Sequence, residues 1–130
     1  MNVVIDANIV IAVVLGEPER AWAIQATRAA VAIAPRSLPF EIGNALSGLL
    51  KRRRLSELGV HAAWSAAKAF QVSLCDIDMG AALRLATAQD IYAYDAYMLQ
   101  CAAETASKLA TLDKKMARVA RTIGIDVLEP

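Results

Sequence analysis

The sequence has few of the residues that bind metals through nitrogen or sulfur. His61 is the only histidine, which excludes mechanisms that need two histidines and argues against a histidine-rich metal site. Cys75 and Cys101 are the only cysteines, and they lack the spacing of a metal site. We expect both to be buried thiols in a reducing cytosol, which favours a cytoplasmic location.

Excess charge and long apolar runs are lacking as well. The formal net charge is +1, so no overall field attracts nucleic acid or a membrane surface, and any such binding needs a local patch. The longest apolar run, Ile9–Leu15, is too short to span a bilayer. We therefore expect no membrane partner.

The sequence does have enough apolar residues for a core. Its length of 130 residues suits a single domain, which we expect to cover residues 1–130, and its hydrophobic fraction of 57% is too high for disorder. No internal repeat or linker interrupts the chain. Strand patterns and helix patterns alternate instead.

Short apolar runs predict the strands, and longer segments between them predict helices. The expected strands are Val3–Ile5, 31–34, 72–75 and 109–112, with 125–128 as a further edge strand. The expected helices are 7–15, 17–30, 37–54, 56–70, 79–88, 94–105 and 114–123. This alternation predicts an α/β fold of three layers, in which helices cover both faces of a central, mainly parallel sheet of four to five strands.

Acidic residues occur where such a fold binds ligands, at the carboxyl ends of its strands. Asp6 follows the first strand, Asp113 follows the fourth, and Glu41 lies in the helix after the second. Asp95 begins a helix that follows no clear strand. Taken singly, Asp6 and Asp113 could be helix caps, and Asp95 a first-turn acid that suits the helix dipole. Their shared edge favours a functional site.

Four carboxylates in one place would repel each other, by about 1 kcal/mol for each pair 4 Å apart even in water. A divalent cation removes this repulsion, and ligation by oxygen alone indicates Mg²⁺, for which Mn²⁺ could substitute, rather than zinc. Mg²⁺ chemistry suggests hydrolysis of a phosphodiester. Asn8 and Thr111, close to Asp6 and Asp113, would either support a metal-bound water or phosphate oxygen, or be ordinary turn and strand residues.

A basic segment, Lys51, Arg52, Arg53 and Arg54, ends the third expected helix. Cations at a helix C-terminus are favoured by the helix dipole, so we expect these residues mainly to form a solvated helix end. The same four side chains are candidates for a modest contribution to binding RNA phosphates.

Four segments together resemble, in order, the acidic motifs of PIN-domain ribonucleases, and most closely the VapC-type toxins of toxin–antitoxin pairs. They are 4–8, 41–46, 94–97 and 109–113. The resemblance covers essentially the whole chain. It implies a Mg²⁺-dependent endoribonuclease, a homodimer and a partner antitoxin, with Asp6, Glu41, Asp95 and Asp113 as the catalytic, metal-binding acids. Asn8 departs from the serine or threonine that is common in the family.

Two other classes of function were compared with this one. A PIN-like binding module without activity would be expected to have lost some of the acids, and all four are present. A phospho-acceptor receiver domain needs adjacent acids after its first strand and a lysine after its fifth, but this chain has Asp6–Ala7 and no lysine after Leu128. The sequence does not reveal which RNA is cut or which antitoxin binds.

Overall fold

The sheet has five strands in the order β3-β2-β1-β4-β5, in a computed structural model that describes residues 1–130. Every pair of neighbouring strands is parallel. The strands are β1 (Asn2–Ile5), β2 (Val31–Pro35), β3 (Ser73–Cys75), β4 (Lys108–Ala110) and β5 (Val127–Leu128). The predicted parallel α/β sheet, including its fifth edge strand, is confirmed.

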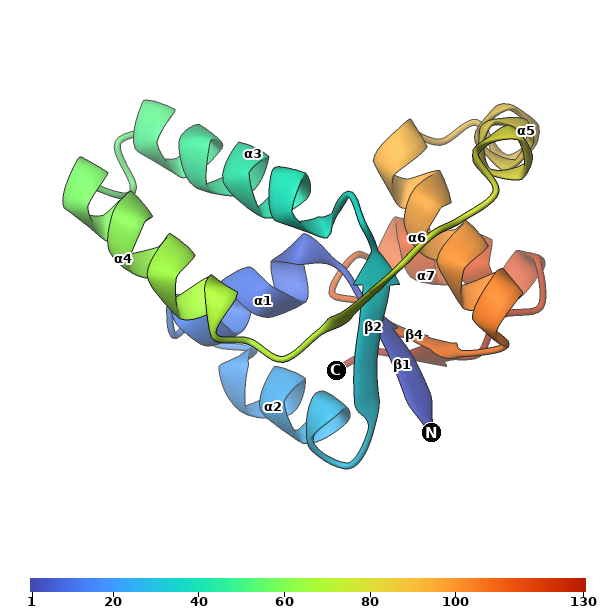
Figure 1. The fold of residues 1–130 in the computed structure, drawn as a ribbon, viewed down its shortest axis with the longest axis horizontal. Coiled ribbons are helices and arrows are strands. Elements are labelled where there is room, and N and C mark those ends of the chain that lie inside the picture. Colours follow the sequence, from blue (N-terminus) through green and yellow to red (C-terminus); the bar gives the residue numbers. More distant parts are fainter.

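Helices cover both faces of this sheet (Figure 1). They are α1 (Ala7–Val14), α2 (Arg20–Arg28), α3 (Leu38–Lys51), α4 (Glu57–Lys68), α5 (Met79–Gln89), α6 (Ala93–Thr105) and α7 (Lys114–Thr122). Helices α1 to α4 lie on one side, and α5 to α7 lie on the other (Figure 1). Right-handed crossovers require this arrangement, because the chain moves outward from β1 to β3 and then returns past β1 to β4. The predicted three layers are confirmed.

Helices α2 and α3 show the largest shortening relative to the ranges predicted from the sequence. Helix α2 begins at Arg20, because residues 17–19 form a turn in which the Arg20 amide donates to the Glu17 carbonyl. Helix α3 ends at Lys51 rather than at Arg54, and Arg53 has a left-handed φ of 57° that takes the chain out of the helix. The first turn of one helix and the last turn of the other are therefore irregular.

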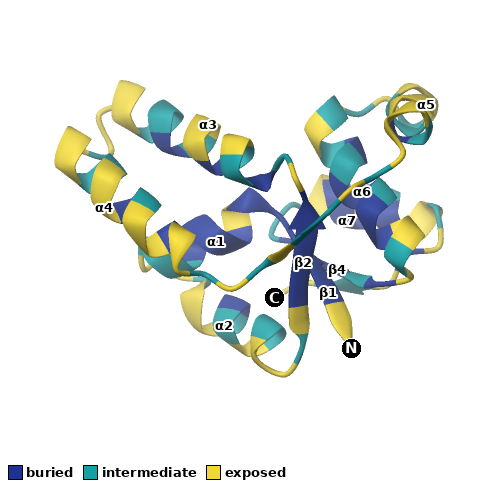
Figure 2. Ribbon diagram, in the orientation of Figure 1, coloured by how far each residue is buried: buried dark blue, intermediate teal, exposed yellow.

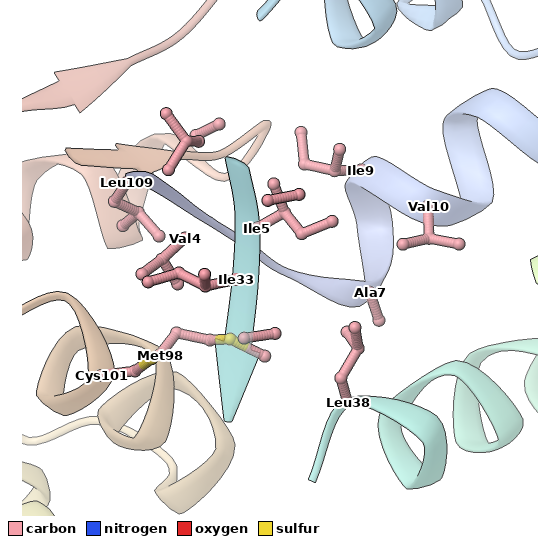
Figure 3. Close-up of a cluster of buried hydrophobic side chains, with 14 of the residues drawn as sticks. Val4, Ile5, Ala7, Ile9, Val10, Ile33, Leu38, Met98, Cys101 and Leu109 are labelled. Atoms are coloured by element: carbon pink, nitrogen blue, oxygen red, sulfur yellow. The ribbon is translucent and has the colours of Figure 1, made fainter. Parts of the chain in front are cut away.

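Strand β1 is the centre of the core. Its residues Val3, Val4 and Ile5 are completely buried, as a strand covered on both faces should be (Figure 2). Figure 3 shows Val4 on the side of Met98 and Cys101 of α6, and Ile5 on the side of Ile9 of α1. Alternate side chains of β1 thus pack against the helices on opposite faces of the sheet. Because β1 is also the central strand, its carboxyl end lies in the middle of the row of strand ends.

The two cysteines differ in burial. Cys101 is buried in α6, and burial raises the pKa of its thiol to about 12. Cys75 is only half-buried at the end of β3, so the expectation that both thiols are buried is wrong for Cys75. Neither is in a disulfide.

No helix has the length and the apolar content needed to cross a membrane.

Candidate active site

Asp6 lies at the carboxyl end of β1 and caps helix α1. Its Oδ1 accepts a hydrogen bond of 3.1 Å from the Ile9 amide, and only 5% of the residue is exposed. Burial raises the pKa of Asp6 to about 6, against the opposing effect of that hydrogen bond. The cap uses one carboxylate oxygen and leaves the other for a second role. Asp6 can therefore both cap α1 and take part in an active site.

Thr111 joins Asp6 to Asp113. Its hydroxyl is completely buried, donates to Oδ2 of Asp6 at 3.3 Å and accepts from the Asp113 amide at 3.0 Å. Asp113 in turn caps α7, with Oδ1 accepting from the amides of Lys115 at 2.8 Å and Met116 at 3.2 Å. One hydroxyl thus fixes the position of one acid relative to the other across neighbouring strands.

Glu41 reaches the same edge from the first turn of α3. The Ser37 hydroxyl donates to its Oε2 at 2.7 Å, so Ser37, at the N-cap position of α3, supports Glu41 rather than capping the helix. Partial burial raises the pKa of Glu41 to about 7, and the negative charges of Asp6 and Asp95 add to this effect. The two ion pairs of the protein involve other carboxylates. Glu41 is therefore a half-buried acid without a basic partner.

Asp95 completes the group from the first turn of α6, which packs on β1, β2 and β4. Burial raises the pKa of Asp95, and the charge of Asp113 raises it further, while the Lys115 ammonium lowers it. In Figure 1, α3 and α6 both begin at the end of the sheet towards which β2 points. The structure therefore brings together Asp6, Glu41, Asp95 and Asp113. Their catalytic and metal-binding roles stay predictions.

The other predicted residues contribute less directly. The Asn8 side chain is exposed, and its backbone amide, rather than its side chain, supports Asp6. Residues Lys51 to Arg54 are exposed at the far end of α3. They lie roughly 15 Å along the helix from Glu41, at 1.5 Å per residue. The structure does not bring them to the acids, and their contact with RNA phosphates stays a prediction.

Two further residues support the site without having been predicted as part of it, Ser37 and Lys115. Ser37 lies four residues before Glu41, a spacing at which side chains on one helix meet. Lys115 lies in the first turn of α7, where the helix dipole disfavours a cation. The spacing of Ser37 and the position of Lys115 can be seen in the sequence. They indicate a role in the site only once Glu41 and Asp95 are known to lie there.

The carboxylates suit a hydrated Mg²⁺ better than a fully protein-ligated metal. No three His, Cys, Asp or Glu side chains form a ready-made direct ligand set. Mg²⁺ does not need one, because it keeps several waters and typically takes one or two carboxylates directly. The donors are all oxygens, and Asp6 and Glu41 are desolvated acids outside both ion pairs of the protein. This donor set fits Mg²⁺.

Several solved structures share the fold. PAE2754 from Pyrobaculum aerophilum is 21% identical, with a TM-score of 0.72 and coverage of 98% of this chain and 92% of that chain. VapBC2 from Rickettsia felis, bound to a DNA fragment from its promoter, is 13% identical, with a TM-score of 0.68 and coverage of 99% and 98%. A toxin–antitoxin complex from Klebsiella pneumoniae is 20% identical, with a TM-score of 0.57 and coverage of 97% and 95%.

These identities are low, so the structural likeness shows the fold alone. No curated protein matches the chain by sequence. The family model of the PIN domain, however, matches residues 3–122, a range that contains all four clustered acids, β2, β3, β4 and all of β1 but its first residue. The chain therefore belongs to the PIN domain family.

Proposed function

We propose that this protein is a Mg²⁺-dependent endoribonuclease that acts in the cytoplasm as the toxin of a toxin–antitoxin pair, with Mn²⁺ able to replace Mg²⁺. The observation that carries the proposal is the group of four carboxylates, which converge on one sheet edge and couple to one another electrostatically. Membership of the PIN family and likeness to a toxin–antitoxin complex support it.

The chain's own residues would share the work as follows. Asp6 and Asp113 each use one oxygen in a helix cap, and Thr111 fixes the second oxygen of Asp6. Glu41 and Asp95 come from helices on opposite faces of the sheet and flank its edge. When bound, Mg²⁺ would lower the pKa of a water and neutralise charge on the phosphate. The four carboxylates would hold the ion and orient the phosphodiester.

Two partners follow from the same proposal. An antitoxin would cover the site, and Phe40, adjacent to Glu41 and 72% exposed, offers an apolar contact for it. A homodimer is proposed from the family resemblance alone. The reading as an inactive binding module is less favoured, because such a module has no need to keep four mutually repelling acids together.

The first test is cleavage of mixed RNAs by the pure protein with Mg²⁺, with Mn²⁺ and with EDTA. We expect cleavage that requires either metal and stops with EDTA. The Asp6→Asn form should lose more than about a hundredfold in rate, beyond the 10–100-fold typical of residues that only support metal ligands. The exposed Asp126 lies at the opposite end of the sheet, where the strands begin. It provides the control Asp126→Asn, which should cleave normally. Undiminished cleavage in EDTA would contradict the metal mechanism.

Growth of a host that expresses the protein tests the proposed role as a toxin. The unmodified chain should slow growth, and the Asp6→Asn form at the same protein level should not. Co-expression of a cognate antitoxin should restore growth. Equal harm from both forms would show that the toxicity is not catalytic.

A further inference from the structure

A small cavity lies beside the carboxylates, at the carboxyl ends of β2 and β3. Its volume is about 200 Å³, and its walls include Arg36, Ser37, Asp76, Ile77, Met79 and Tyr97. One of these residues connects it to the site, because Ser37 donates a hydrogen bond of 2.7 Å to Glu41. A group in this cavity would therefore be a close neighbour of any phosphate held by the carboxylates.

The cavity combines apolar walls with a charged rim. Ile77, Met79 and the ring of Tyr97 supply the apolar surface. Arg36 and Asp76 supply the rim, where the Arg36 Nε lies 2.6 Å from the Asp76 Oδ1. Such a combination suits a planar ligand that is apolar on its faces and polar on its edge. An unpaired nucleobase is a ligand of this kind, because its face stacks on aromatic and apolar side chains.

The ion pair at the rim is exposed, with 63% of the Arg36 side chain and 84% of the Asp76 side chain accessible to solvent. Exposed pairs contribute only about 0–1 kcal/mol to stability, so stability gives little reason for the pair. Arg36 uses only Nε in the contact, and Asp76 uses only Oδ1. The terminal Arg36 nitrogens and the Asp76 Oδ2 therefore remain free for a ligand.

We propose that this cavity binds one unpaired guanine base of the RNA, next to the phosphodiester that is cut. The proposal rests on the ribonuclease function proposed above. Guanine presents two adjacent acceptors, O6 and N7, which an arginine fork recognises. It also presents two adjacent donors, N1–H and the N2 amino group, which suit a carboxylate. These two pairs of groups lie next to each other on guanine, as the guanidinium and the carboxylate do at the rim of the cavity.

The test uses short single-stranded RNAs that differ at one position. The base there is guanine, adenine, 7-deazaguanine, which lacks the N7 acceptor, or hypoxanthine, which lacks the N2 amino group. The 5′ ends of the products locate the cut beside that base. We expect kcat/KM to fall about tenfold for each guanine analogue and further for adenine, in the range of one lost base contact.

Protein variants assign each contact to a side chain. Arg36→Lys keeps the charge but loses the fork, so this variant should no longer distinguish guanine from 7-deazaguanine. Asp76→Asn should no longer distinguish guanine from hypoxanthine. The matched controls are Arg121→Lys and Glu129→Gln, which alter the other exposed ion pair, near β5, and should retain both preferences.

The outcomes separate the two proposals. If the protein cuts all four RNAs at equal rates, the guanine site is wrong while the ribonuclease function stands. If it cuts neither these RNAs nor the mixed RNAs, the ribonuclease function is wrong, and binding of the four short RNAs, labelled with a fluorophore, decides the guanine site on its own. Equal affinity for the guanine and 7-deazaguanine RNAs would then overturn the guanine site as well.

Discussion

The two ends of the sheet differ in what they contain. The amino end has the larger hollow, about 570 Å³, lined mainly by small or apolar residues together with Asn2, Ser107, Lys108 and Asp126. The carboxyl end has the smaller cavity, of about 200 Å³. Beside that cavity, the same end of the sheet has the four clustered carboxylates, three of which have a raised pKa. At the amino end, the buried Ser107 hydroxyl pairs with that of Thr105 at 2.7 Å. At the carboxyl end, Asp6 and Glu41 are in no ion pair, and the one nearby cation, Lys115, acts on Asp95.

In this contrast it is unbalanced charge, rather than the size of a hollow, that distinguishes the end where we propose the active site. A desolvated carboxylate without a cation costs free energy, and a fold retains such a cost where a ligand removes it. The amino end has no comparable cost. Substitutions at the two ends should therefore have different consequences for stability and for activity, and three experiments measure that difference.

The largest effect is expected at Thr111, the hydroxyl that joins Asp6 to Asp113. Thr111→Val leaves the Asp6 Oδ2 and the Asp113 amide without their partner in a buried place, which should cost about 1–3 kcal/mol in the free energy of unfolding. Cleavage should fall about 10–100-fold. Urea unfolding and cleavage rates measure the two effects. Ser107→Ala at the amino end should leave cleavage unchanged, and an equal loss of cleavage there would remove the contrast.

A gain in stability is expected at Asp95. Asp95→Asn removes a charge that both Asp113 and Glu41 repel, and also removes a weaker attraction to Lys115. In EDTA the variant should be more stable by roughly 1–2 kcal/mol, because each close repulsion is worth about 1 kcal/mol or more. Its melting temperature should rise by a few degrees. Mg²⁺ should stabilise the unmodified protein more than the variant, since it binds only the native state.

Asp126→Asn is the matched control for this experiment, since Asp126 is exposed at the amino end. It should change the melting temperature little, with or without Mg²⁺. A lower melting temperature for Asp95→Asn in EDTA, with no effect of Mg²⁺ on any form, would show that Asp95 is only a first-turn acid of α6.

The smallest effect is a pH dependence at Glu41. Its pKa is raised from 4.5 to about 7, so ionised Glu41 destabilises the metal-free fold. This penalty is absent below about pH 4.5, grows as the pH rises, and is complete above about pH 7. Glu41→Gln should thus gain about 1 kcal/mol at pH 8, an allowance that includes partial solvent screening, and nothing near pH 4.5. Thermal melting in EDTA across this range measures it, and an equal gain at both pH values would contradict the assignment.

The sequence predicted the parts of the site that strands position. Asp6 and Asp113 follow buried strands, and the carboxyl ends of parallel strands share one edge, so their meeting follows from local pattern. Asp95 could not be placed in this way, because α6 follows α5 rather than a strand. Its position depends on how α6 packs across β1, β2 and β4, and the family resemblance alone anticipated it.

The rim of the small cavity was not predictable for a similar reason. Arg36 and Asp76 are 40 residues apart and meet only because β2 and β3 pair in register. Each looks like an ordinary loop residue when read alone. Basic residues 51–54 were visible as a run, yet the length of α3 separates them from the acids. The local sequence thus shows which charged residues are present, while tertiary packing decides which of them meet.

The hydrogen bond between Thr111 and Asp6 joins residues that are 105 positions apart, and this has a consequence for synthesis of the protein. Ribosomes add about 5–20 residues per second, so Thr111 and Asp113 are made roughly 5–20 s after Asp6. Until then, β1 has no β4 to pair with, and the nascent chain contains Asp6 without Asp113. A growing chain therefore has no assembled group of carboxylates, and the proposed ribonuclease activity can begin only after the last strands are made.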